Sequence, residues 1–221
     1  LHLAHTLAAD DATYSHVLSN RGLLHDTAGD RRLAAMFLHE GARLAELSGE
    51  SATLIMALGN LTNVLNVDRP AEAIEPNERA QALAAQIGDR TTGGLLLTNL
   101  AYSYLAVGDW DAAERTLARG DHADLFTDHT YLAVTAALFS ALRGDAETAR
   151  ALTTAGAAQL DSEDPQDRAG LATAQAFAAY AVGDSERALA YARDSLTDLG
   201  RESWLSFAGD DGRWAWPLAA R

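Results

Sequence analysis

Apolar and small residues recur along nearly the whole chain at helical spacing, three to four residues apart, and each run of this pattern stops at a short polar turn. No stretch of five or more residues alternates between apolar and polar positions as a half-buried strand does. The pattern therefore predicts an all-α protein. The predicted helices cover residues 11–27, 31–47, 52–66, 70–86, 93–107, 110–120, 127–142, 145–160, 166–182 and 185–199, with a further segment from about 202.

Gly-Asp pairs mark a repeat within this pattern, namely Gly29-Asp30, Gly108-Asp109, Gly144-Asp145 and Gly183-Asp184. The last two gaps are 36 and 39 residues, and the first gap of 79 has its midpoint at Arg69-Pro70. Glycine suits the left-handed end of one helix, and the aspartate that follows suits the cap of the next helix. We therefore predict one domain, residues 1–221, with helical hairpins at about 11–49, 50–88, 91–121, 125–162 and 165–200 and a partial unit at 201–221.

The third unit resembles a tetratricopeptide repeat. Ala101 and Tyr104 precede the Gly108 turn, and Ala113 and Leu117 follow it, where that motif has small and large residues. A small residue lets two helices approach closely while an aromatic ring fills the space beside it. The resemblance implies a right-handed α-solenoid of about five tetratricopeptide-like hairpins, in which the first helix of each hairpin lines a concave groove.

Two longer stretches, residues 83–101 and 213–220, look like the helical-repeat regions of large bacterial signalling regulators of the actinobacterial type. Those proteins join an ATPase module to such repeats and add a LuxR-type DNA-binding domain or a nucleotide cyclase domain. The resemblance implies that the chain is a piece of a longer cytoplasmic protein, in which it is a non-catalytic module for protein–protein interaction or ligand sensing. A freestanding scaffold or oligomerisation protein is the alternative.

Composition narrows the function further. The formal net charge is −14, all 17 basic residues are arginines, and there is no cysteine. An acidic chain with scattered arginines repels nucleic acid and anionic membranes, and the lack of cysteine excludes thiolate chemistry. We expect the charge to lie on turns and the convex face. Alanine takes 47 positions, and we expect it to mark close helix contacts where it recurs in the repeat, at Ala101, Ala137 and Ala176 and again at Ala113, Ala149 and Ala188. The expected partner is a protein or peptide, or a small molecule, in the concave groove.

Three asparagines recur in register. Asn20 and Asn99 stand nine residues before their turn glycines, and Asn60 stands nine before Arg69. On the first helices of a solenoid, such a row can bind a peptide backbone or a carboxylate through its amides. In the other interpretation, each amide binds a neighbouring helix backbone and sets the repeat geometry. We predict Asn20, Asn60, Asn99 and Tyr102 as the ligand-binding residues.

Signs of catalysis are few. The chain has no Gly-x-Ser-x-Gly nucleophile motif and no His-Glu-x-x-His metal motif. His122, Asp124, Asp128 and His129 form the densest group of ligand-type side chains, so an enzyme would have its site near His122 and His129. We expect no enzyme activity, no metal and no cofactor.

Three of the four tryptophans, Trp204, Trp214 and Trp216, crowd the last 18 residues. Indole rings bury a large apolar area, and the end of a solenoid needs a cap. We expect these rings to cap the array or pack between units. A docking surface for another subunit is the other interpretation.

Overall fold

The computed structural model describes residues 10–120, 130–163, 165–200, 215 and 217–220. Within these ranges the regular secondary structure is helical, without a strand, as the sequence predicts. The helices are α2 (Asp11–Thr27), α3 (Arg31–Ser48), α4 (Ser51–Asp68), α5 (Pro70–Ile87), α6 (Arg90–Val107), α7 (Trp110–Leu117), α8 (Thr130–Leu142), α9 (Ala146–Ala155), α10 (Pro165–Ala181) and α11 (Ser185–Gly200), with a 3-10 helix η1 (Gly156–Asp161) after α9.

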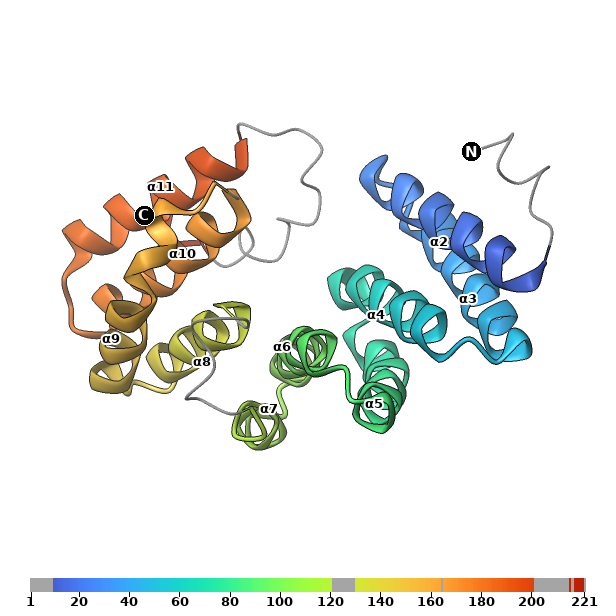
Figure 1. Ribbon diagram of the computed structural model, residues 1–221. Helices are drawn as coiled ribbons and strands as arrows, with labels where there is room; N and C mark the ends of the chain where they lie inside the picture. Colours follow the sequence, from blue (N-terminus) through green and yellow to red (C-terminus); the bar gives the residue numbers. More distant parts are fainter. Residues whose placement is uncertain (1–9, 121–129, 164, 201–214, 216, 221) are drawn as a thin grey trace. The chain divides into compact units, whose positions relative to one another are not determined.

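Neighbouring helices pack in pairs. The helices α2 and α3, α4 and α5, α8 and α9, and α10 and α11 contact each other (Figure 1). The chain forms two compact units, residues 1–116 (unit 1) and residues 117–221 (unit 2). We call α2, α4, α6, α8 and α10 the first helices and α3, α5, α7, α9 and α11 the second helices.

The Gly-Asp turns have the predicted geometry. All four glycines adopt left-handed φ values between 80° and 85°, and Gly49 and Gly88 do so at 73°. At the first turn, the Asp30 amide donates to the His25 carbonyl (2.8 Å), and the Asp30 carboxylate accepts from the Leu33 amide (3.1 Å). One dipeptide thus ends a helix and caps the next. Between α4 and α5, Pro70 takes the first helical position instead, where its missing N–H costs nothing.

Most predicted helix bounds agree with the structure to within two residues, and the exceptions have local causes. The helix α6 begins at Arg90 instead of residue 93, because the Asp89 carboxylate accepts from the Thr92 amide (3.0 Å) and caps it. The helix α7 ends at Leu117 instead of residue 120, where the Gly120 amide donates to the Leu117 carbonyl. The predicted helix 145–160 is wrong in its second half, since it becomes 3-10 from Gly156. Residues 127–129 of the predicted seventh helix lie outside the described residues.

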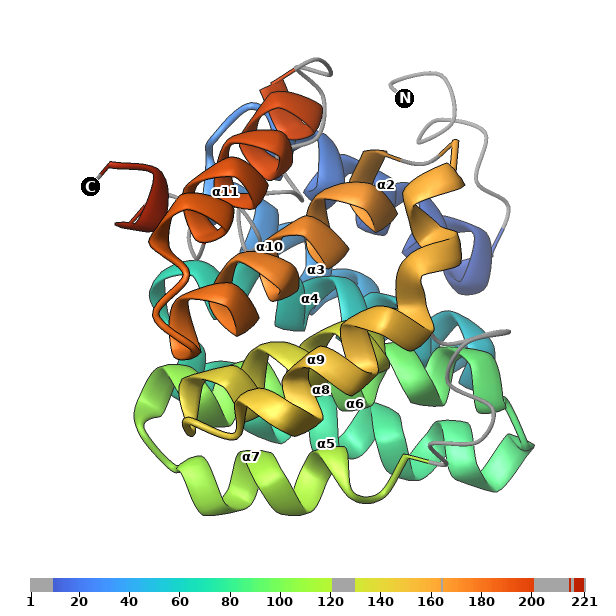
Figure 2. The ribbon, with the colours of Figure 1, turned by 90° about the vertical axis from the view of Figure 1, so that its left-hand side faces the viewer.

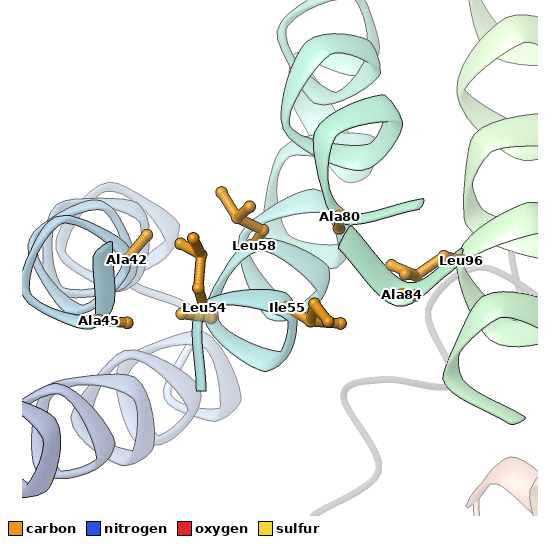
Figure 3. Packing of buried hydrophobic residues seen from close by; sticks show 9 residues of the cluster. Ala42, Ala45, Leu54, Ile55, Leu58, Ala80, Ala84 and Leu96 are labelled. Carbon is orange, nitrogen blue, oxygen red and sulfur yellow. The ribbon is translucent and has the colours of Figure 1, made fainter. Parts of the chain in front are cut away.

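Unit 1 is built by inserting large side chains of first helices between small side chains of second helices. Leu54 of α4 lies beside Ala42 and Ala45 of α3, and Ile55 points toward Ala84 of α5 (Figure 3). A second cluster repeats the arrangement one step along the helices; its members are Ala34, Ala35, Leu38, Leu61, Val64, Leu65 and Ala73. Alanine lets the helix axes approach, and the longer aliphatic chains fill the space that remains.

The predicted role of alanine in close contacts is confirmed. Alanines at the repeat positions are all at most 2% exposed, and they include Ala101, Ala113, Ala137, Ala149, Ala176 and Ala188. In the first hairpin, glycine takes this position. A Cβ added to Gly22 would lie 2.6 Å from the Leu38 Cγ, so α2 and α3 meet there more closely than an alanine permits.

Unit 2 contains α8, α9, η1, α10 and α11 (Figure 2). The helix α8 contacts α9 and α10, and α10 contacts α11. Near the end of the chain, Leu218 packs with Ala176 of α10 and Ala192 of α11. The described part of the final segment thus covers the last hairpin. The predicted roles of Trp204, Trp214 and Trp216 fall on residues outside the described ranges.

Candidate functional site

The three first helices of unit 1 lie side by side, because α4 contacts both α2 and α6. Side chains join these helices at two places. His16 Nε2 of α2 and Thr53 Oγ1 of α4 are 3.0 Å apart, and the Ser103 hydroxyl of α6 donates to Asn66 Oδ1 of α4 at 2.6 Å. The first contact lies near the start of α4 and the second near its end.

Neighbours on several sides leave α4 with one accessible stripe. From Thr53 to Asn66, every residue is buried except Met56, Gly59, Asn60 and Asn63. These four positions follow helical spacing and lie on one face. Asn60, predicted from the sequence, is at the centre of the stripe, and Asn63, which sequence reasoning missed, is one turn further along.

The helices α2 and α6 have corresponding stripes. On α6, Leu95 is 41% exposed, and Asn99 and Tyr102 follow it at half-buried positions. On α2, Asn20 is exposed and Leu24 is 55% exposed. We define the first-helix face as eight accessible side chains of these three stripes, namely Asn20, Leu24, Met56, Asn60, Asn63, Leu95, Asn99 and Tyr102.

Within the part of the chain that the structure describes, the amides of this face have no structural role. The side chains of Asn20, Asn60, Asn63 and Asn99 form no hydrogen bond with any residue that the structure describes. The alternative role, binding the backbone of a neighbouring helix, is filled by Asn66, whose Nδ2 donates to the Asn99 carbonyl at 3.2 Å. Its partner Ser103 also donates to that carbonyl, at 2.9 Å. Structural and accessible asparagines are thus different residues on α4.

On α4 and α6 the face also lacks formal charge, whereas on α2 the exposed His16 lies one turn before Asn20. Residues 51–67 of α4 and 91–107 of α6 include no Asp, Glu, Arg or His. Charged side chains gather on the second helices, where Arg43 pairs with Glu40 of α3, and Arg79 of α5 pairs with Glu46 of α3. The hydrogen bond and charge of Arg43 lower the pKa of Glu40 below its ordinary value. The surface beside the amides of α4 and α6 is therefore neutral, and its other accessible side chains are Met56, Leu95 and Tyr102.

The two tyrosines of α6, Tyr102 and Tyr104, lie in different surroundings. The Tyr104 hydroxyl donates to Glu78 Oε1 of α5 at 2.8 Å. Burial of the ring raises the pKa of Tyr104, and the bond to Glu78 raises it further. Tyr104 thus ties α6 to the charged second helix, whereas Tyr102 lies in the same stripe as Asn99.

A buried carboxyl group lies at the turn end of α2, away from the asparagine row. Asp26 is 8% exposed, and the Arg31 Nε is 3.8 Å from its Oδ1. Burial raises the pKa of Asp26, Arg31 opposes this, and the negative charge of Asp68 raises the pKa again. Its ion-pair partner is Arg31, and within the described ranges no carboxylate or histidine forms a hydrogen bond with it, so the group lacks the paired arrangement of a catalytic acid.

Unit 2 does not continue the amide row. The positions nine residues before Gly144 and Gly183 are Thr135 and Ala174, which are 4% and 0% exposed. From Leu132 to Phe139, α8 is buried at every position. The candidate site therefore belongs to unit 1.

The possible enzyme site near His122 and His129, with Asp124 and Asp128, lies outside the described residues. Among the residues with described positions, no three His, Asp or Glu side chains gather closely enough to hold a metal ion. No helix in the described ranges has the length and apolar character needed to cross a bilayer.

Comparison with known proteins adds no relative from which a role can be transferred. No family model matches the chain, and no curated protein matches it. The functional argument therefore rests on the first-helix face.

Proposed function

We propose that the chain is a non-catalytic interaction module that binds an extended peptide segment of a protein partner on the first-helix face. In this proposal the helix pairs form a right-handed solenoid of about five tetratricopeptide-like hairpins, with residues 201–221 as a partial sixth. The first-helix face then lines the concave groove of the solenoid.

One observation carries the proposal. Asn20, Asn60 and Asn99 occupy equivalent positions on three adjacent helices, are accessible, and form no side-chain hydrogen bond with any described residue. Each amide offers both a donor and an acceptor, which is the pair of groups that a peptide backbone requires. Because Asn66 already provides the structural contact to α6, the three accessible amides are available to a ligand.

The neighbouring side chains indicate the chemical class of the peptide. Met56 and Leu95 are each 41% exposed and lie one turn before Asn60 and Asn99. Methionine adapts its shape to apolar groups, so these two residues suit apolar side chains of the ligand. On α4 and α6 the face carries no cation to hold a carboxylate terminus. A neutral segment with apolar side chains fits this surface better than an acidic chain end.

We further propose that the module works within a larger cytoplasmic bacterial regulator of transcription or signalling. The resemblance of residues 83–101 and 213–220 to the repeat regions of such proteins supports this assignment. Binding in the groove would then change the curvature of the repeats or release a neighbouring ATPase module. The coding sequence on either side of these residues tests this, since a parent gene that encodes the module alone excludes a regulator and favours a freestanding scaffold.

The binding proposal is tested by selecting peptides from a random phage-displayed library on the complete chain. We expect enriched peptides to be rich in apolar residues. Their affinity for an Asn20→Ala, Asn60→Ala, Asn99→Ala variant should fall about tenfold or more, equivalent to about 1.4 kcal/mol, because the backbone loses its amide partners. Isothermal calorimetry measures the change.

The matched control removes accessible polar groups from a second helix. Glu75→Ala and Gln86→Ala alter exposed positions of α5 and should leave affinity unchanged. Equal affinity for all variants, or a library that yields no specific peptide, would show that the face is not a peptide site.

A further inference from the structure

Buried polar side chains lie along the contact of α4, α5 and α6, between apolar clusters. Most of them have partners. Asn66 is bonded to α6 as described, and Gln81 Nε2 of α5 donates to the Gly93 carbonyl of α6 at 2.7 Å. The hydroxyl of Thr62 donates to the Leu58 carbonyl of its own helix at 2.9 Å. In these cases the buried polar group is satisfied by the protein itself.

Asn77 is the exception. It is 0% exposed, and neither its amide nitrogen nor its amide oxygen has a hydrogen-bond partner among the described residues. It lies on α5 one turn before Gln81 and one turn after Ala73. Ala73 belongs to one apolar cluster and Ala80 to the other, so the amide is placed where α5 passes from one cluster to the next.

The residue before Asn77 is a proline inside the helix. Pro76 has no N–H, so the Glu72 carbonyl loses the donor that an α-helix normally supplies four residues later. Glu72 is exposed, so bulk solvent can satisfy its carbonyl. The Asn77 amide is buried instead, and the aliphatic side chains of the two clusters offer it neither a donor nor an acceptor.

From these observations we infer that Asn77 binds an internal water molecule within unit 1. Water supplies both a donor and acceptors in the smallest volume, and buried waters in proteins usually satisfy such groups. A buried ion is disfavoured, because the flanking clusters contain only aliphatic and alanine side chains to face it. The water substitutes for the missing protein partner of the Asn77 amide.

The test uses the isotope-labelled complete chain and nuclear magnetic resonance of the Asn77 side-chain NH2 group. We expect a cross-peak between these protons and water, with the sign of a long-lived bound water. The Asn66 NH2 group is the matched control, since its nitrogen donates to the Asn99 carbonyl, and it should show a weaker cross-peak. In Asn77→Leu the water cross-peaks of the neighbouring backbone amides should disappear.

Absence of a water cross-peak from the assigned Asn77 amide in the unaltered chain would overturn the inference. A hydrogen-bond scalar coupling between that amide and a protein carbonyl would overturn it as well. The wild-type spectrum decides the question by itself if Asn77→Leu does not fold. The result does not depend on peptide binding, because Asn77 is not part of the first-helix face.

Discussion

The first helices of unit 1 and unit 2 differ in what they leave accessible. In unit 1, α4 keeps one stripe of accessible residues with Asn60 at its centre. In unit 2, α8 is buried from Leu132 to Phe139, and Thr135 and Ala174 stand buried where unit 1 has asparagine. The same turn-and-helix pattern therefore leaves an accessible stripe on the first helices of one unit and buries the corresponding positions in the other. Two units can therefore share the Gly-Asp turn and still differ in which side chains their first helices expose.

The largest expected effect is a loss of stability that stays within one unit when a core side chain of that unit is shortened. Leu61→Ala in unit 1 and Leu138→Ala in unit 2 each remove a side chain that is 1% exposed, and each should cost about 2–5 kcal/mol. Because repeat units interact mainly with their neighbours, Leu61→Ala should reduce hydrogen-exchange protection in α3–α5 more than in α8–α10, and Leu138→Ala should do the reverse. Equal loss across the chain would show one cooperative block.

The next largest effect is on stability, when a side chain is added where two helices pack closely. Gly22→Ala places a Cβ 2.6 Å from Leu38 Cγ and should destabilise the protein by about 1–3 kcal/mol. Gly93→Ala, whose Cβ meets nothing within 4 Å, should instead stabilise α6 by up to about 1 kcal/mol. Thermal denaturation followed by circular dichroism compares the two. A Gly22→Ala variant as stable as the unaltered chain would mean that α2 and α3 can move apart freely.

Exchanging the amide between units tests the faces directly. Ala174→Asn puts an amide at a position that is 0% exposed and should cost about 1–3 kcal/mol. Asn60→Ala removes an accessible amide without a partner and should change stability by less than about 0.5 kcal/mol. Urea denaturation of both variants measures this. Similar costs for the two changes would remove the distinction between an open and a closed first helix.

The smallest expected effects are in how the stability contributed by single carboxyl groups changes with pH. The bond to Thr92 lowers the pKa of Asp89, so its stabilisation is present at neutral pH and is lost as the pH falls through that lowered value. Asp89→Ala should therefore cost about 1 kcal/mol at about pH 7, and the cost should shrink as the pH falls through the lowered pKa of Asp89. Asp145→Ala in unit 2 should follow the same direction, because Thr148 lowers the pKa of Asp145 in the same way.

Asp26 should respond in the opposite direction. Burial raises its pKa, so its favourable contribution is present at low pH and is lost as the pH rises through the raised value. Asp26→Asn should stabilise the protein at neutral pH, with a gain that shrinks on acidification. Melting temperatures measured across this range check the sign. A variant that is less stable at neutral pH would show that the ion pair with Arg31 outweighs burial.

The sequence predicts the parts of this structure that depend on local chemistry. A Gly-Asp pair ends one helix and begins the next through bonds within about nine residues, so the turns at Gly29 and Gly183 are readable without knowing the fold. The sequence also predicts that positions such as Ala101 and Ala176 are buried, because only a small residue fits where two helices touch.

Features that depend on how the helices pack against one another are harder to predict from the sequence. Periodicity identifies the buried side of an amphipathic helix, but α8 is apolar on all sides and its pattern does not show which face meets α10. Asn60, Asn63 and Asn66 share residue type and helix, yet only Asn66 reaches α6. Asn66 and Ser103 are 37 residues apart, so their hydrogen bond can be recognised only once the helices are placed in space.

The turn glycines also have a consequence for how the chain folds. Each turn is completed by contacts between residues close in sequence, such as Asp30 with His25 and Leu33, so little chain entropy is lost in forming it. A protein assembled from such hairpins has a low contact order and folds rapidly. Folding can start at any of several turns and spread to the neighbouring hairpin, so no single nucleus has to be preserved by selection.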